Sequence, residues 1–157
     1  MIDRICRFEK LLARMSELSA PLISLLARVY LANVFFSAGL TKIANWQSTM
    51  YLFEHEYSVP LLSPTLAACL GTGAELILPI FIFLGFGGRL FVIGLFIFNL
   101  VATISYEFLW TADGHAGLND HLQWGLLLLL LWVTNYGKIS VDYWIKRKLC
   151  SAEGPRV

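Results

Sequence analysis

Two ionisable residues interrupt long apolar runs of this chain, where a charge is costly. Arg28 lies in the run at 21–41, and Glu75 lies in the run at 65–84. A charge at the centre of a membrane-spanning helix costs at least about 2.5 to 3.5 kcal/mol, so such a group faces protein or trapped water and has a partner. Because helix geometry puts Arg28 and Glu75 at depths about 5 Å apart, we expect the long guanidinium to pair with the carboxylate.

Further polar residues extend this arrangement toward one side of the membrane. Lys42 falls within about 40° of Arg28 around the first helix, so two cations share one face. The expected ligand-binding residues of a polar cleft are Arg28, Lys42, Glu75 and Asn99. In this cleft the two cations would stabilise a developing negative charge, and Glu75 would hold Arg28 in place. The alternative is a buried ion pair that only fixes the register of the helices.

Proton transfer is the second chemistry that the sequence suggests. The catalytic candidates are His121, Glu107 and Asp120, which lie on the same side of the predicted membrane as Lys42. A histidine with an unperturbed pKa of about 6.5 titrates near neutral pH, so His121 with Glu107 or Asp120 could relay protons to the surface. Ordinary polarity at the membrane interface explains the same residues equally well.

The histidine spacing does not favour a metal site. His55, His115 and His121 all lie on one predicted side of the membrane. Glu54, His55 and Glu56 are consecutive, however, so a helix would point them in three directions, and no two histidines have the spacing of ligands on one helix. We therefore expect no metal ion.

Apolar helices must position these residues. Hydrophobic residues make up 57% of the chain and charged residues 15%, against roughly a quarter charged in soluble domains. A spanning helix needs about 20 apolar residues, and the four runs that reach this length are 21–41, 65–84, 90–109 and 120–137. The sequence thus predicts an all-α fold, a bundle of four transmembrane helices in contact with the lipid bilayer.

Two other segments have the pattern of short amphipathic helices that lie at the membrane surface. The first, residues 2–18, has the apolar stripe Ile5, Phe8, Leu12 and Met15. The second follows the first span and has the stripe Trp46, Met50, Phe53 and Tyr57. Both favour anchoring at the interface. We divide the chain into an amphipathic segment at 1–20, a membrane domain at 21–145 and a basic tail at 146–157.

The distribution of basic residues predicts the orientation. Ten of the Lys and Arg residues flank the spans on one side, and Lys42 alone lies on the other. Since basic residues are held on the cytoplasmic side, both termini are predicted to be cytoplasmic in a multi-pass protein. The net charge of +1 and the absence of any nucleic-acid motif argue against a nucleic-acid partner.

Several short motifs together resemble one family. They are Arg28, S-A-G-L-T-K at 37–42, G-x-x-x-E at 71–75, G-x-G-G-R-L at 85–90, H-L-Q-W-G-L-L-L-L-L-L at 121–131 and I-S-V-D-Y at 139–143. Their order and spacing resemble the DoxX family of small four-helix bacterial membrane proteins, over roughly residues 22–145. One departure is visible, because Asn135, Tyr136 and Gly137 stand where many members have Gly-Pro-Gly. The resemblance implies a bacterial inner-membrane protein.

Three functions are compatible with these observations. The resemblance implies a membrane redox system, since the family includes quinone-linked thiosulfate oxidation subunits, and the cleft would hold a quinone-like or other small ligand. The chain has no haem, flavin or nucleotide motif, so electrons would come from a membrane or soluble partner protein. The alternatives are a non-enzymatic scaffold or anchor subunit and a small carrier of an anion or metal, which would need a homo-oligomer. The sequence leaves open whether the chain is an enzyme.

Overall fold

The computed structural model describes residues 2–134 and 136–152. All regular secondary-structure elements in this part of the chain are helices. The elements are α1 (Ile2–Ala44), α2 (Trp46–His55), α3 (Pro64–Leu84), α4 (Arg89–Ser105), the short 3-10 helix η1 (Glu107–Trp110), α5 (His115–Thr134) and α6 (Val141–Ala152). An isolated bridge joins Tyr57 to Tyr106. The all-α prediction is therefore confirmed for the described residues.

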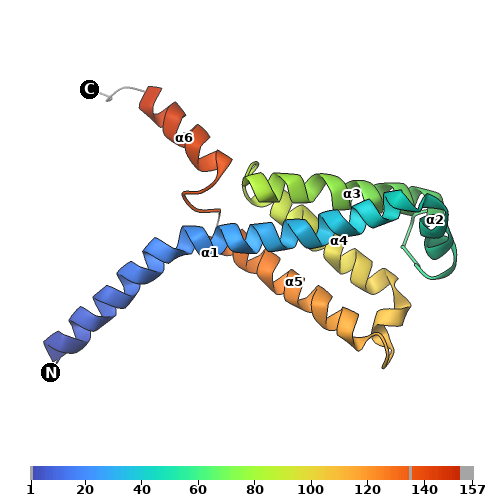
Figure 1. Ribbon diagram of the computed structural model, residues 1–157, viewed down its shortest axis with the longest axis horizontal. Coiled ribbons are helices and arrows are strands. Elements are labelled where there is room, and N and C mark those ends of the chain that lie inside the picture. The colour runs from blue at the N-terminus through green and yellow to red at the C-terminus, as the bar shows by residue number, and fades with distance from the viewer. Residues whose placement is uncertain (1, 135, 153–157) are drawn as a thin grey trace.

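Helices α1, α3, α4 and α5 form an up-and-down bundle (Figure 1). At one end, which we call the α2 end, α2 and the loop at 56–63 connect α1 to α3. At the other, which we call the α6 end, α3 turns into α4 and α5 leads into α6. The first part of α1 and helix α6 both project from this second end (Figure 1).

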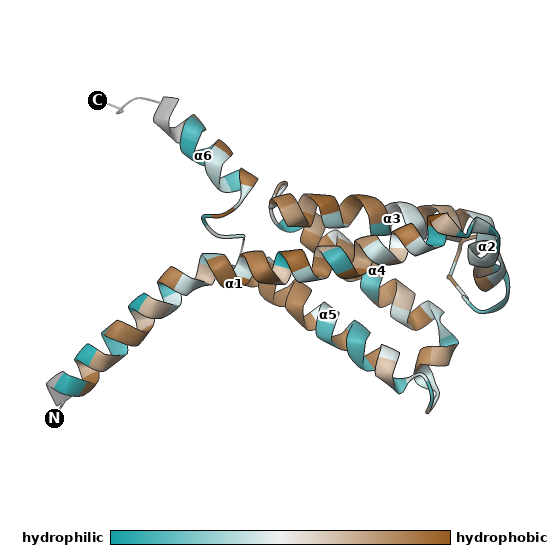
Figure 2. Ribbon diagram, in the orientation of Figure 1, coloured by the Kyte–Doolittle hydropathy of each residue, from teal (hydrophilic) through white to brown (hydrophobic). Residues whose placement is uncertain are grey.

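The four predicted spans coincide with the four bundle helices, with shifted boundaries. Of the described helices, α1 and α3 are long and apolar enough to cross a membrane. Helix α4 has 17 residues, about 25 Å of helix, and α5 begins five residues before its predicted span with polar first turns. Hydrophobic residues nevertheless dominate α3, α4 and the second half of α5 (Figure 2). Large apolar side chains, such as Ile77, Ile97 and Leu126, are exposed on these helices, as expected of surfaces that face lipid.

The first amphipathic segment is helical, but it is not a separate helix. Residues 2–20 are the first part of α1, which continues through Pro21 without a break, and the side chains from Arg4 to Ala20 are exposed. The second amphipathic segment forms α2, which ends at His55, so Tyr57 lies just beyond it. Phe53 packs α2 against Ala67 and Ala68 of α3. The apolar side of α2 therefore covers the α2 end of the bundle.

Candidate functional site

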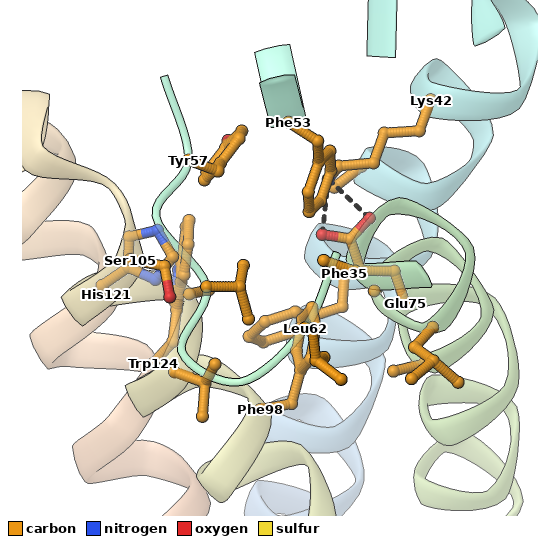
Figure 3. A pocket seen from close by; sticks show the side chains of 18 of the residues that line it. Phe35, Lys42, Phe53, Tyr57, Leu62, Glu75, Phe98, Ser105, His121 and Trp124 are labelled. Carbon is orange, nitrogen blue, oxygen red and sulfur yellow. Dashed lines mark hydrogen bonds and ion pairs between the residues drawn. The ribbon is translucent and has the colours of Figure 1, made fainter. Parts of the chain in front are cut away.

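A cavity of about 450 Å³ lies at the α2 end of the bundle (Figure 3). All four bundle helices contribute to it, and α2 and the loop at 56–63 cover it. Its aromatic lining residues are Phe35, Phe53, Tyr57, Phe98 and Trp124. The volume is within the range of about 300 to 1,000 Å³ that is usual for small-molecule sites, and such sites combine apolar walls with a few polar groups.

One group of polar side chains in the cavity is an ion pair between α1 and α3. Nζ of Lys42 lies 2.6 Å from each carboxylate oxygen of Glu75. Gly39, one turn before Lys42, lets the two helices approach closely, since a Cβ there would come within 3.1 Å of Leu76 and Glu75. A buried pair is favourable only when its geometry is good and both charges remain. The pair therefore holds a cation and an anion at the cavity wall.

The second polar group comes from α4 and α5. Asn99 donates from Nδ2 to the backbone oxygen of His121 (2.9 Å), and its Oδ1 lies 2.8 Å from Nδ1 of the same histidine. Because the first bond fixes the amide orientation, Oδ1 is the acceptor and Nδ1 of His121 is the donor. A neutral His121 therefore has Nε2 as an acceptor. The histidine lines the cavity, whereas Asn99 positions it from behind.

Ser105 has a buried hydroxyl that lacks a partner. The residue is 1% exposed, it lines the cavity, and its Oγ has no hydrogen bond to any described residue. Leaving a buried polar group unpaired costs about 1 to 3 kcal/mol, so unpaired groups are rare and call for an explanation. A ligand with a hydrogen-bond acceptor in the cavity would satisfy this hydroxyl.

The predicted pairing of Arg28 with Glu75 is wrong. Arg28 donates from Nη1 to the backbone oxygen of Phe83 (3.0 Å) and from Nη2 to that of Ile139. Its guanidinium also lies over the ring of Tyr136, 5.3 Å from the centroid. Arg28 thus caps one carbonyl in the last turn of α3 at the α6 end and does not line the cavity, which lies at the α2 end.

The reason for the error is the relative position of α1 and α3. Gly39, not Arg28, lies against Glu75, and eleven residues of helix correspond to about 16 Å. Arg28 is therefore level with the end of α3, where Gly85 adopts a left-handed conformation with φ of 65°. Asp142 joins the same cluster, because its carboxylate accepts from the Gly87 backbone N–H (3.0 Å). Three motifs far apart in the sequence thus meet at the α6 end.

The remaining predicted site residues lie outside the cavity. Glu107 begins η1 and Asp120 lies on α5, and both side chains are exposed. Asp120 is adjacent in sequence to His121. In the described chain, no group of three or more His, Cys, Asp or Glu side chains could hold a metal ion.

Several site residues were not predicted from the sequence. Phe53 and Tyr57 were assigned to a surface-anchoring stripe, but both line the cavity. Burial, together with nearby Tyr106, Glu75 and Glu56, raises the pKa of Tyr57 to about 12, so its phenol stays protonated. The amphipathic stripe was a usable signal for these two residues.

Comparison with known proteins identifies the family of this chain. A family model, DoxX, matches residues 23–108, which include both residues of the ion pair and Ser105 but end before His121. No curated protein and no solved structure matches the chain. Since the matched segment covers more than half of the sequence, the chain belongs to the DoxX family, and this family and the apolar helices together point to a membrane protein.

Proposed function

We propose that the cavity binds a flat, membrane-dissolved molecule of the quinone class and that the protein is a component of a membrane redox system. The observation that carries the proposal is the unpaired hydroxyl of Ser105 inside an aromatic-lined cavity. A ligand that fits must have a hydrogen-bond acceptor for this hydroxyl and an apolar, flat body for the walls.

The polar groups are arranged on two sides of the cavity. Lys42 and Glu75 lie on one side, Ser105 and His121 on the other, and aromatic rings stand between them (Figure 3). A quinone ring has carbonyl oxygens on opposite edges, so one can accept from Ser105 and the other from Lys42. The ammonium would then stabilise the negative charge that develops on reduction.

Reduction of a quinone to a quinol consumes two electrons and two protons. A membrane or soluble partner protein supplies the electrons in this proposal. Each proton comes from water by way of exposed Asp120 or Glu107, is taken up at the unprotonated Nε2 of His121, and passes from there to a quinone oxygen. Asn99 acts as a positioning residue, because it holds the His121 ring by two contacts.

Access from the lipid supports a membrane-dissolved ligand. Leu62, Leu70 and Val101 line the cavity and are also exposed on the surface of the protein. We propose that α1, α3, α4 and α5 all cross the bacterial inner membrane, with both termini in the cytoplasm. In that arrangement the surface between α3 and α4 faces the lipid, and a ligand with a hydrophobic chain enters there.

Binding of a short-chain quinone to the purified full-length protein in mild detergent tests the proposal. Replacing Ser105 by Ala removes one hydrogen bond worth about 0.5 to 1.5 kcal/mol, so the affinity should fall about 2- to 13-fold. Ser37→Ala is the matched control, because Ser37 is exposed on α1 and does not line the cavity. A folded protein that binds no quinone would refute the proposal and favour the scaffold function, in which the ion pair only fixes helix register.

A further inference from the structure

The exposed face of α1 has an apolar pattern that its own bundle does not use. Along the whole helix, the residues on this face follow one another at alternating intervals of three and four residues, which is the heptad pattern of paired helices. We call these residues the α1 stripe: Ile5, Phe8, Leu12, Met15, Ser19, Leu22, Leu26, Val29, Asn33, Phe36, Leu40 and Ile43. Only Ser19 and Asn33 are polar.

The α1 stripe lies on the exposed side of α1 and borders α3 only around Val29, Asn33 and Phe36. Its members are exposed, except for half-buried Phe36. The opposite face of α1 is buried within the bundle at Ser24, Arg28, Leu31 and Phe35. Beyond the bundle this opposite face becomes charged, with Arg7, Lys10 and Arg14. The α1 stripe alone keeps its apolar character along the entire helix, as expected if one long helix packs against it.

Asn33 distinguishes a protein partner from lipid. It lies near the middle of the segment between Pro21 and Ala44, and its side chain is exposed. No described residue forms a hydrogen bond with the side-chain amide of Asn33. It also lines a shallow apolar groove of about 500 Å³ between α1 and α3, together with Val29 and Phe36. Lipid tails cannot bond an amide, whereas Asn side chains hydrogen-bond between membrane helices.

We infer that two copies of this chain form a parallel dimer through the α1 stripe. An amide both donates and accepts hydrogen bonds, so two Asn33 side chains satisfy each other across a twofold axis when the helices are parallel and in register. Two copies inserted in the same orientation present α1 in this way. A single Asn in an otherwise apolar heptad seam specifies register and the number of helices. The α1 residues that line the cavity lie off the stripe, so each copy keeps its cavity.

Cysteine cross-linking of the full-length protein in native membranes tests the dimer. In a background with Cys6, Cys69 and Cys150 replaced by Ser, Leu26→Cys and Leu40→Cys should each cross-link to a second copy under mild oxidation. Leu126→Cys on α5 is the matched control, since Leu126 is 62% exposed and Leu26 is 60% exposed. Cross-linking of Leu126→Cys as efficient as that of the two stripe positions would overturn the inference.

The role of Asn33 is tested by the dimer dissociation constant in detergent. Asn33→Leu should raise the dissociation constant about 5- to 30-fold, as expected for the loss of one hydrogen bond between membrane helices. Asn33→Gln, which keeps the amide, should raise it less than Asn33→Leu does. Asn119→Leu, the same change at an exposed Asn of α5, should leave it unchanged. An unchanged constant in Asn33→Leu would refute the asparagine contact. Quinone binding is measured on the same samples, so a failure of the dimer and a failure of the cavity are distinguishable.

Discussion

Replacing Arg28 by Leu should lower the stability of the protein and leave quinone binding intact. The guanidinium donates to two backbone oxygens, one from the end of α3 and one from the segment that leads into α6. Hydrogen bonds from a charged donor contribute about 1.5 to 3 kcal/mol each, so the gross loss is about 3 to 6 kcal/mol. The desolvation that buried Arg28 no longer incurs offsets part of this, and we expect a net loss of about 2 to 4 kcal/mol.

The assay is thermal unfolding of the full-length protein in mild detergent, followed by circular dichroism. For a chain of this length, each kcal/mol corresponds to roughly 2 to 4 °C, so Tm should fall by about 5 to 15 °C. Arg89→Leu is the matched control, because Arg89 also lies at the α6 end but is exposed and forms no hydrogen bond through its side chain within the described chain. Its Tm should change by less than about 2 °C.

Quinone binding, measured well below the Tm of both variants, separates the structural role from a role at the ligand. Arg28 caps α3 at the α6 end and does not line the cavity, so the affinity of Arg28→Leu should match that of the unaltered protein. Loss of quinone binding at an unchanged Tm would refute this reasoning. That result would indicate that Arg28 binds the ligand, as its position in an apolar run suggests.

Three other experiments test the remaining parts of the structure. Lys42→Met leaves the Glu75 carboxylate without its partner and should destabilise the protein by about 3 to 5 kcal/mol in chemical denaturation. Adding Glu75→Leu to this variant should recover more than about 1 kcal/mol of that loss. Additive losses from the two substitutions would contradict a coupled pair. Gly85→Ala forces a Cβ into contacts of 2.5 and 2.6 Å at a positive φ and should cost about 1 to 3 kcal/mol, while Gly73→Ala, with open space around it, should stabilise α3 by about 0.5 to 1 kcal/mol. A Tm for Gly85→Ala equal to that of Gly73→Ala would exclude a strained turn. Burial raises the pKa of the Tyr57 phenol from its usual value of about 10 to about 12. The stability that the buried, protonated phenol contributes is therefore complete below pH 10, and on the order of 3 kcal/mol of it is lost as the pH rises through 12. Tyr57→Phe should remove that part of the alkaline loss of stability, and an identical pH profile would contradict the burial of the phenol.

Local patterns in the sequence predict the helices well. Each of the four apolar runs overlaps one bundle helix. The start of α3 differs from its prediction by one residue, because Ser63 and Pro64 begin the helix and Gly85 ends it. The stripe of Trp46, Met50 and Phe53 likewise predicts α2. These features depend on residues close together in the chain, which is why periodicity and capping are sufficient to find them.

The composition of the site depends on contacts that no local pattern contains. Aligning the predicted ends of two spans placed Arg28 beside Glu75. In the structure, however, α1 continues beyond the bundle and its packing at Gly39 sets a different register, so that Glu75 pairs with Lys42. Ser105 looks like ordinary polarity at the end of a span, and only the folded structure shows that its hydroxyl is buried at the cavity without a partner among the described residues. The sequence alone determined the helices, their apolar character and the residue types available for chemistry. Tertiary structure decided which of those residues meet, because the relative depth of neighbouring helices is set by side-chain packing between them.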